Sequence, residues 1–174
     1  MEPDDIGIPA GHSYLFKKGG SSAAFDIFKR FLVSGRRGII LSRLPPEKIP
    51  ILYEVECPSI WIVSRPPSKG SVMTVDPQRL TRVYSLIGDF VRNNPGSVAL
   101  LDGLNYLLSE NDFSSVMKTV QLINEAIAMT RSILLVPIDP KGFSDTELGF
   151  LEREIPPFEM DFYAMELLRG DNIF

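Results

Sequence analysis

Four apolar runs in this sequence end in charged residues that could take part in phosphate or metal-ion chemistry. The run GIILS is followed by Arg43, IWIVS by Arg65, VALL by Asp102 and LLVPI by Asp139. An aspartate at the end of a buried strand is where nucleotide hydrolases hold Mg²⁺, and an arginine fork binds anions. Asp102 therefore poses the central question: it either holds a metal ion or completes a strand.

Two interpretations of these charged residues are open at the level of sequence. In the first, they are polar strand ends that pair as Arg–Asp bridges, and Asp139-Pro140 begins a turn. In the second, Arg43 or Arg65 binds an anion at the edge of a sheet, and Asp102 is free to bind a metal ion. In both, the side chains converge, because the carboxyl ends of parallel strands share one edge of the sheet.

Nucleotide hydrolysis would also need a phosphate loop, and one glycine-rich turn lies in a suitable place. FKKGGSSAAF, residues 16–25, follows an apolar run and opens a helical pattern. In G-x-x-x-x-G-K-[ST] the lysine follows the glycines and reaches the phosphates, whereas Lys17 and Lys18 precede them. We expect Ser21 or Ser22 to cap the next helix, where a hydroxyl could hold an anion weakly. The positioned lysine is missing.

The single histidine and the single cysteine exclude several kinds of site. With only His12 and Cys57, no internal disulfide can form and no Cys/His zinc site can be assembled within one chain. A Ser-His-Asp triad would have to use His12, which lies in a predicted N-terminal loop. Cys57 precedes a proline and an apolar run, so we expect it to be a small buried hydrophobic residue.

The composition is that of one globular domain with an ordinary core. The chain has 174 residues, 44% hydrophobic, with a net charge of -4, so it offers no bulk attraction to nucleic acid. We expect no nucleic-acid partner and no cofactor. The acidic N-terminus lacks the order of a signal peptide, and no run approaches a membrane span. A cytoplasmic location without membrane attachment is therefore predicted.

Short apolar runs alternate with longer segments of helical period, which is typical of βα units around a parallel sheet. The runs are continuously apolar, as in strands that are buried on both faces. The predicted fold class is a three-layer α/β/α architecture with a mainly parallel sheet of about five strands and a C-terminal extension. The predicted strands are 13–16, 38–42, 60–64, 97–102 and 132–139, and the predicted helices are 22–33, 77–91, 113–129 and 144–154.

Three helix starts carry specific signals. Asn111 or Asp112 is expected to cap the helix that begins at residue 113. Asp76-Pro77 predicts an N-cap followed by a first-turn proline. Ser144-x-x-Glu147 predicts a capping box at the start of a shorter helix. The segment between Arg43 and Ser59 is less regular and proline-rich, so a loop with one short helical turn is expected there.

The order of these segments resembles an archaeal family known only as domain of unknown function 835. The resemblance rests on GHSYLF, FKRFLVSGRRGIILSRLPPEKI, IWIVSR, VALLDGLNYLLSENDF and ILLVPIDP, and it spans about residues 11–154. The Ser-Arg-x-Pro and L-L-D-G-L-x-Y-L segments are its most specific motifs. Members of this family often occur beside sensor and signalling domains. The resemblance therefore implies a signalling or adaptor role for this protein.

More distantly, the layout resembles the RecA/KaiC-type ATPase core. That resemblance places Asp102 in the position of the Walker B aspartate, and Arg43 where those ATPases carry their water-activating acid. A guanidinium stays protonated and cannot act as a general base. The phosphate-loop lysine and the acid therefore both depart from the ATPase pattern, so the resemblance implies the fold while the two departures argue against hydrolysis.

The predicted organisation is an N-terminal extension (1–12), a RecA-like domain (13–155) and a C-terminal tail (156–174). The tail is unusually apolar and aromatic for a terminal extension, and we expect it to pack on the core or to dock on a second copy or another protein. Its large apolar side chains are Phe158, Met160, Phe162, Tyr163, Met165, Leu167 and Leu168.

The leading hypothesis is a non-catalytic RecA-like binding or adaptor module in signalling or regulation. It would bind a protein partner, self-associate or hold a small anionic ligand, with Asp102 as a structural strand end paired to an arginine or to local N–H groups. No residue is assigned as catalytic. The candidate ligand-binding residues are Arg43, Arg65, Ser21, Ser22, Asp102 and Asp139.

The alternative is a nucleotide-binding phosphohydrolase or phosphotransferase. In that case Asp102 and Asp139 would hold Mg²⁺, and Arg43 or Arg65 would clamp a phosphate. Nucleic-acid binding is a third hypothesis, because RecA relatives bind DNA, but the acidic charge balance argues against it.

Overall fold

The computed structural model describes residues 7–67, 70 and 72–159. Within these residues six strands form one sheet in the order β1-β6-β5-β2-β3-β4, and every pairing between neighbouring strands is parallel. The strands are β1 (His12–Phe16), β2 (Gly38–Ser42), β3 (Ser59–Ile62), β4 (Thr74–Val75), β5 (Val98–Asp102) and β6 (Ile133–Pro137).

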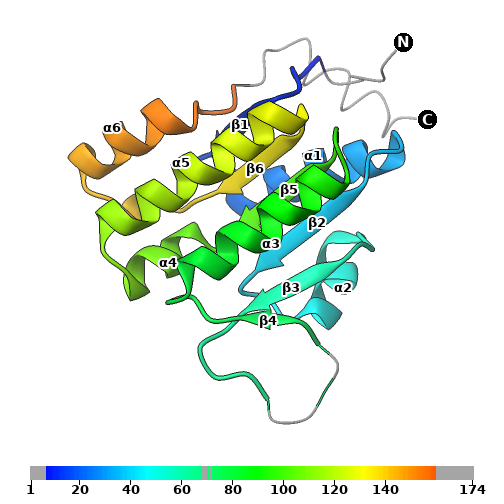
Figure 1. The fold of residues 1–174 in the computed structure, drawn as a ribbon, viewed down its shortest axis with the longest axis horizontal. Coiled ribbons are helices and arrows are strands. Elements are labelled where there is room, and N and C mark those ends of the chain that lie inside the picture. The colour runs from blue at the N-terminus through cyan, green and yellow to red at the C-terminus, as the bar shows by residue number, and fades with distance from the viewer. Residues whose placement is uncertain (1–6, 68–69, 71, 160–174) are drawn as a thin grey trace.

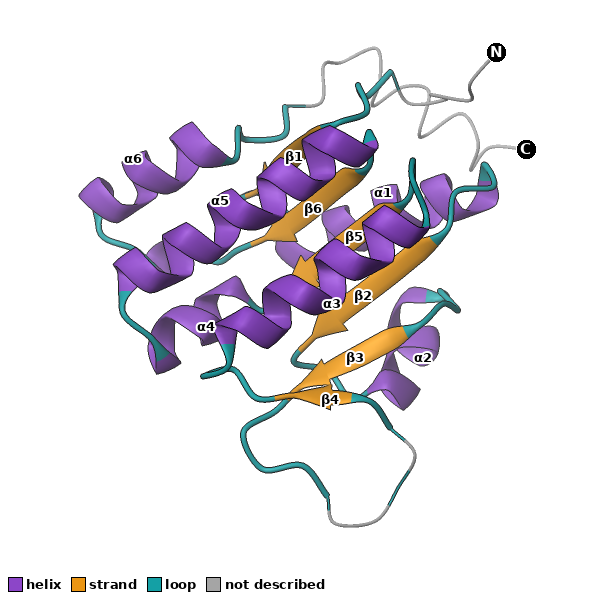
Figure 2. Ribbon diagram, viewed as in Figure 1, coloured by secondary structure: helices purple, strands orange, loops and turns teal. Residues whose placement is uncertain are grey.

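The described helices cover both faces of this sheet (Figures 1 and 2). One face carries α3, α4, α5 and α6, and the other carries α1 and α2. The helices are α1 (Gly20–Val33), α2 (Ile49–Tyr53), α3 (Leu80–Asn93), α4 (Leu104–Glu110), α5 (Phe113–Thr130) and α6 (Asp145–Glu154).

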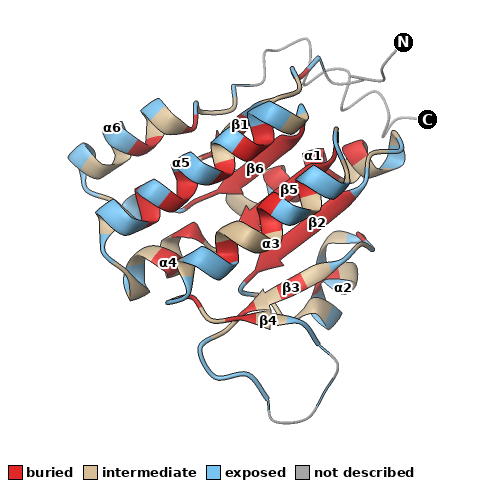
Figure 3. Ribbon diagram, in the orientation of Figure 1, coloured by how far each residue is buried: buried red, intermediate tan, exposed pale blue. Residues whose placement is uncertain are grey.

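The central strands are buried on both faces, which explains their continuously apolar sequence (Figure 3). Successive residues of β2 point to opposite sides: Ile39 and Leu41 pack beneath α3 and α5, whereas Ile40 packs against α1. Neighbouring β5 follows the same alternation, with Leu101 on the first side and Leu100 on the second. Two hydrophobic cores therefore form, one on each face of the sheet.

The predicted fold class is confirmed, and three details differ. The helix α4 is not among the predicted helices. The sheet gains a sixth strand, β4, which has two residues at the sheet edge and carries no recognisable apolar run. The predicted start of the helix at Pro77 is wrong, because α3 begins at Leu80. Asp76 instead accepts a hydrogen bond from the backbone N–H of Gln78 at 2.9 Å and closes a turn before the helix.

Other local signals behave as the sequence predicts. Ser144 and Glu147 form the complete capping box at the start of α6. Asp112 caps α5 by accepting from the N–H of Ser115 at 2.8 Å. The irregular segment after β2 contains a 3₁₀ turn, Pro46–Lys48, followed by the short helix α2.

The first residues of the C-terminal tail lie along the free edge of β1. The N–H of Phe158 donates to the carbonyl of Leu15 at 2.7 Å, and the Leu15 N–H donates to the carbonyl of Pro156 at 2.9 Å. The Phe158 ring stacks on Phe16 with a centroid distance of 4.7 Å. The rest of the predicted tail, from Met160 onward, lies outside the described residues.

Among the described helices, none has the length and apolar content needed to cross a membrane.

Candidate functional site

Asp102 lies at the carboxyl end of β5, and two serine hydroxyls donate hydrogen bonds to its carboxylate. Ser21 Oγ donates to one oxygen at 2.8 Å, and Ser42 Oγ donates to the other at 2.9 Å. Ser42 is the last residue of β2 and lies directly opposite Asp102 in the parallel register. The expected pairing of this carboxylate with an arginine or with backbone N–H groups is therefore wrong, because neighbouring serines satisfy it.

Ser21 reaches Asp102 because it lies in the first turn of α1 and does not cap that helix. The N-cap position belongs to Gly19, whose φ of 74° is left-handed and is readily adopted by glycine. The prediction that Ser21 or Ser22 caps the helix is wrong for this reason. Ser22 is exposed, and no hydrogen bond of its side chain is found among the described residues.

The residue immediately before Ser21 is Gly20, which also has a positive φ of 49°. In a phosphate loop the residue before the hydroxyl-bearing Ser or Thr is the lysine that reaches the phosphates. The lysines of this turn lie earlier in the chain, and Lys17 forms an ion pair with Glu152 on α6 at 2.5 Å. No lysine therefore lies directly before Ser21 in this turn.

Tyr53, the last residue of α2, lies within the electrostatic influence of Asp102. Its ring stacks on Phe25 of α1, with a centroid distance of 3.8 Å and an interplanar angle of 4°. Burial raises the pKa of the Tyr53 hydroxyl, and the negative charge of Asp102 raises this pKa further. Tyr53 therefore stays neutral beside the carboxylate.

Asp139 is held at its strand end by a residue that follows Asp102 closely. Asn105 donates from Nδ2 to the Asp139 carbonyl at 3.0 Å, and the Asp139 N–H donates back to Asn105 Oδ1 at 3.0 Å. The Asp139 carboxylate accepts from the N–H of Lys141 at 3.0 Å and begins the turn after β6. The structure therefore agrees with the turn role of Asp139-Pro140.

The next residue, Tyr106, connects the ends of β2 and β3. The Arg43 guanidinium lies over its ring at 4.2 Å from the centroid, and its hydroxyl donates to Ser64 at 3.3 Å. The Arg43 carbonyl accepts from Trp61 Nε1 at 3.0 Å. Arg43 is thus exposed but oriented by an aromatic ring.

Arg65 follows Ser64 directly and is exposed, and no ion pair of its guanidinium is found among the described residues. No Arg–Asp bridge joins any pair of the four strand-end residues within the described ranges. The predicted bridges are wrong: the two aspartates are satisfied by serine, asparagine and backbone groups, and the two arginines face solvent.

Two glycines allow these close contacts. A Cβ on Gly103 would lie 2.9 Å from Ile62 Cδ1, so a larger residue there would require the Ile62 side chain to shift. A Cβ on Gly142 would lie 2.4 Å from Asn105 Nδ2 and would displace the amide that holds Asp139. The segment Asp102–Tyr106 therefore connects the ends of β2, β3, β5 and β6 with the first turn of α1.

Several residues of this site are not identified by their sequence patterns. Ser42 belongs to a Ser-Arg pair in which only the arginine carries a charge. Asn105 and Tyr106 lie in a motif that indicates the family but does not indicate their contacts. Tyr53 carries no local signal, because only the tertiary fold brings α2 to Asp102.

Chemically, the arrangement is a satisfied polar cluster beside two solvent-facing arginines. Within the described ranges, no group of three or more His, Cys, Asp or Glu side chains is placed to hold a metal ion. Gly20 lies directly before Ser21 and carries no charge, and the Arg43 guanidinium cannot accept a proton from water.

Two solved structures share this fold. A Pyrococcus horikoshii OT3 protein superposes with a TM-score of 0.58 at 10% identity, covering 90% of this chain and 85% of its own. The flagellar accessory protein FlaH from Methanocaldococcus jannaschii gives a TM-score of 0.56 at 14% identity, covering 92% and 81%. At such identities the likeness shows the fold alone, and that fold is RecA-like α/β.

The sequence itself then gives the family. Residues 18–155 match the family described as Protein of unknown function (DUF835), and the chain belongs to it. No curated protein matches this chain.

Proposed function

We propose that this protein is a non-catalytic RecA-like binding or adaptor module that acts in signalling or regulation in the cytoplasm. The observation that carries the proposal is the state of Asp102. Both of its carboxylate oxygens accept hydrogen bonds from Ser21 and Ser42, and Gly20 stands where a phosphate loop has its lysine. The family resemblance, which implies neighbouring sensor domains, supports the signalling role.

The same residues give the reason for the absence of catalysis. Phosphoryl transfer depends almost entirely on positioned charge around the phosphates. Lys17 is engaged by Glu152, and Gly20 supplies no charge. Arg43 cannot accept a proton from water. Ser21 and Asp102 would fit Mg²⁺, but a nucleotide phosphate would lack its cradle, so these residues support no hydrolytic step.

The binding surface that we propose is the solvent-facing side of the strand ends. Arg43 and Arg65 supply two guanidinium groups there, on an acidic chain. Arg43 is pre-oriented by Tyr106, which lowers the entropy lost on contact. These arginines would bind a carboxylate or phosphate of a protein partner or of a small anionic ligand.

Titration calorimetry with ATP, with and without Mg²⁺, tests the proposal. We expect no Mg²⁺-dependent binding, and any weak anion binding is expected to fall in Arg43→Ala and Arg65→Ala. Ser21→Ala and Ser22→Ala form a matched pair, since only Ser21 contacts Asp102. Mg²⁺-dependent nucleotide binding that is lost in Ser21→Ala and kept in Ser22→Ala would overturn the proposal.

A second candidate is the phosphohydrolase or phosphotransferase in which Asp102 and Asp139 hold Mg²⁺ and Arg43 or Arg65 clamps a phosphate. One observation favours it: the Ser21 hydroxyl and the Asp102 carboxylate lie 2.8 Å apart, as the Mg²⁺-binding pair of phosphate-loop enzymes requires. Against it, the Asp139 carboxylate accepts from the N–H of Lys141. Calorimetric titration with ATP and Mg²⁺ also separates the two candidates.

A further inference from the structure

A groove of about 810 Å³ lies between the first halves of α3 and α5, on the face of the sheet opposite α1 (Figure 1). Its volume is within the range of ligand and peptide sites. The described lining extends from Gln78 to Ser85 on the α3 side and from Asn111 to Leu122 on the α5 side. At 1.5 Å per residue the longer wall measures about 16 Å, which is the length of about three helical turns.

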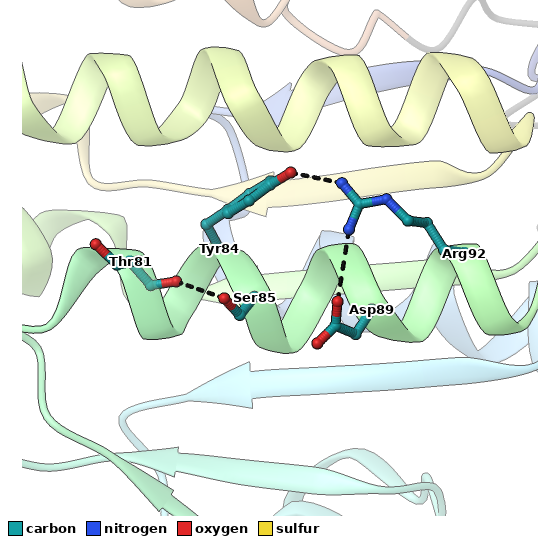
Figure 4. Close-up of polar contacts among 5 residues, drawn as sticks. All are labelled: Thr81, Tyr84, Ser85, Asp89 and Arg92. Atoms are coloured by element: carbon teal, nitrogen blue, oxygen red, sulfur yellow. Dashed lines mark hydrogen bonds and ion pairs between the residues drawn. The ribbon is translucent and has the colours of Figure 1, made fainter.

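The apolar part of this lining is held in position and is partly exposed. Leu80 and Tyr84 lie one turn apart on α3, and Leu122 of α5 is 38% exposed. The Tyr84 ring points from α3 toward α5, where Arg92 donates a hydrogen bond to its hydroxyl (Figure 4). Asp89 neutralises Arg92 in an ion pair at 3.5 Å. Large side chains therefore remain in contact with water along a concave surface.

The charge of the groove is of one sign and lies on both walls. Arg79 and Arg82 line the α3 side, Lys118 lines the α5 side, and all three are exposed. No carboxylate is among the described lining residues, and no ion pair of these cations is found within the described ranges. On a chain of net charge -4, this is a local concentration of unpaired positive charge.

The two acidic residues nearest in sequence to the α5 wall have other partners. Glu110 accepts a hydrogen bond from Gln78 at 3.3 Å. Asp112 accepts from the N–H of Ser115 at 2.8 Å and from its hydroxyl at 2.9 Å. Neither carboxylate forms an ion pair with the three groove cations.

Several neutral polar side chains of the lining are satisfied within the chain. The Ser85 hydroxyl donates to the carbonyl of Thr81 at 2.9 Å (Figure 4). The Thr119 hydroxyl donates to the carbonyl of Ser115 at 3.0 Å, and the Asn111 amide donates to two backbone carbonyls. What the groove offers to a partner is therefore its apolar surface and its positive charge.

This arrangement is complementary to one kind of segment. An amphipathic helix lies along a groove with its apolar stripe facing inward. Acidic residues on both sides of such a stripe would meet Arg79 and Arg82 on one wall and Lys118 on the other. A small anion would match the charge but would leave Leu80 and Leu122 in contact with water.

We propose that the groove between α3 and α5 binds an acidic amphipathic helix of a partner protein. Leu80, Tyr84 and Leu122 contact its apolar stripe, and Arg79, Arg82 and Lys118 pair with carboxylates on its two sides. This surface differs from the strand ends that carry Arg43 and Arg65, and it does not depend on them.

Fluorescence anisotropy with a designed probe tests the proposal. The probe is a labelled peptide of about twelve residues, with leucines at helical spacing and glutamates on both sides of them. We expect the full chain to bind it, and Arg79→Glu combined with Arg82→Glu is expected to weaken the binding by about tenfold or more. Lys48→Glu combined with Lys141→Glu is the matched control and should not weaken it, since both lysines are exposed in 3₁₀ turns outside the groove.

Further measurements make the test specific to the groove. A probe with lysines in place of the glutamates should not bind, and added salt should weaken binding of the acidic probe. The bound probe should shift the amide NMR signals of residues 78–85 and 111–122. Lys118→Glu, on the opposite wall, should also weaken binding, so the test stands even if the double arginine variant does not fold by circular dichroism.

Five outcomes would overturn the proposal. The first two are no binding of the acidic probe by the native chain, and equal binding by the charge-reversed and control variants. The third is signal shifts confined to residues around Arg43 and Arg65, which would assign the probe to the strand ends. The fourth is binding of inorganic phosphate that excludes the probe at matched ionic strength, which would assign the groove to a small anion. The fifth is self-association in sedimentation that is lost in Arg79→Glu with Arg82→Glu, which would assign it to a second copy.

Discussion

At the scale of single residues, Asp102 is a strand-end carboxylate held by hydrogen bonds from two serine hydroxyls. It is half-buried, and two hydroxyls from elements far apart in sequence, Ser21 and Ser42, satisfy it. Ser42 is fully buried and also accepts from the Leu44 N–H at 3.0 Å. A buried polar group costs free energy when it loses its partner, so these hydroxyls hold the strand ends in place.

Ser42→Ala is expected to lower the free energy of unfolding by about 1–3 kcal/mol, because it leaves one Asp102 oxygen and the Leu44 N–H without a partner. Urea unfolding followed by circular dichroism measures this change. Ser22→Ala serves as the control, since Ser22 is exposed, and it should stay within about 0.5 kcal/mol of the native chain. Equal effects of the two substitutions would show that Asp102 does not depend on Ser42.

Cys57 predicts a pH dependence of stability. Burial raises the pKa of its thiol to about 12 in the folded protein, whereas the thiol pKa in the unfolded chain is about 8.5. Above that pH the unfolded state loses a proton that the native state keeps, so stability falls as pH rises from about 9 toward 12.

Urea unfolding at pH 8 and pH 10 measures this loss, and Cys57→Ala should make it smaller. Tyr53, whose pKa is also raised by burial and by Asp102, leaves a residual slope of the same sign. An identical slope in the native chain and in Cys57→Ala would contradict the burial of the thiol.

At the scale of elements, the segment between β5 and α4 organises the edge of the sheet. Asp102 contacts the end of β2, Asn105 contacts the end of β6, and Tyr106 contacts residues that follow β2 and β3. Their spacing could be read from the sequence, but their partners could not, because the partners are fixed by strand order. Ser42 faces Asp102 only because β2 and β5 are neighbours in the sheet.

Gly142→Ala is expected to destabilise the protein, since the added Cβ would meet Asn105 Nδ2 at 2.4 Å and break the contact that holds Asp139. Gly149→Ala is the matched control: nothing lies within 4 Å of its added Cβ, and it lies inside α6. That change should stabilise by about 0.5–1 kcal/mol through helix propensity. Thermal unfolding compares the two variants, and a Gly142→Ala chain as stable as Gly149→Ala would refute the role of Asn105.

At the scale of the whole molecule, the fold was more accessible from sequence than the site. Continuously apolar runs such as 38–42 predict buried parallel strands, and the structure places β2 at those residues. The short edge strand β4 escaped prediction because two residues carry no periodic signal. The start of α3 was misplaced because Asp76 and Pro77 form a turn whose chemistry resembles that of a helix cap.

The site was less predictable because its contacts join distant segments. The sequence identified Arg43, Arg65, Asp102 and Asp139 as strand ends, but pairing rules based on charge alone suggested bridges that do not form. Instead, two serine hydroxyls hydrogen-bond to Asp102, Asn105 and a backbone N–H hold Asp139, and the Tyr106 ring orients Arg43. The proposal of a non-catalytic module rests on this whole arrangement and on no single residue.

Release of inorganic phosphate from ATP in the presence of Mg²⁺ measures directly whether this protein hydrolyses ATP. The full chain and its Asp102→Asn variant are compared over hours at matched concentration, with native folding of the variant checked by circular dichroism. We expect no release of phosphate above the uncatalysed background in either sample. Mg²⁺-dependent turnover by the native chain that disappears in Asp102→Asn would contradict it.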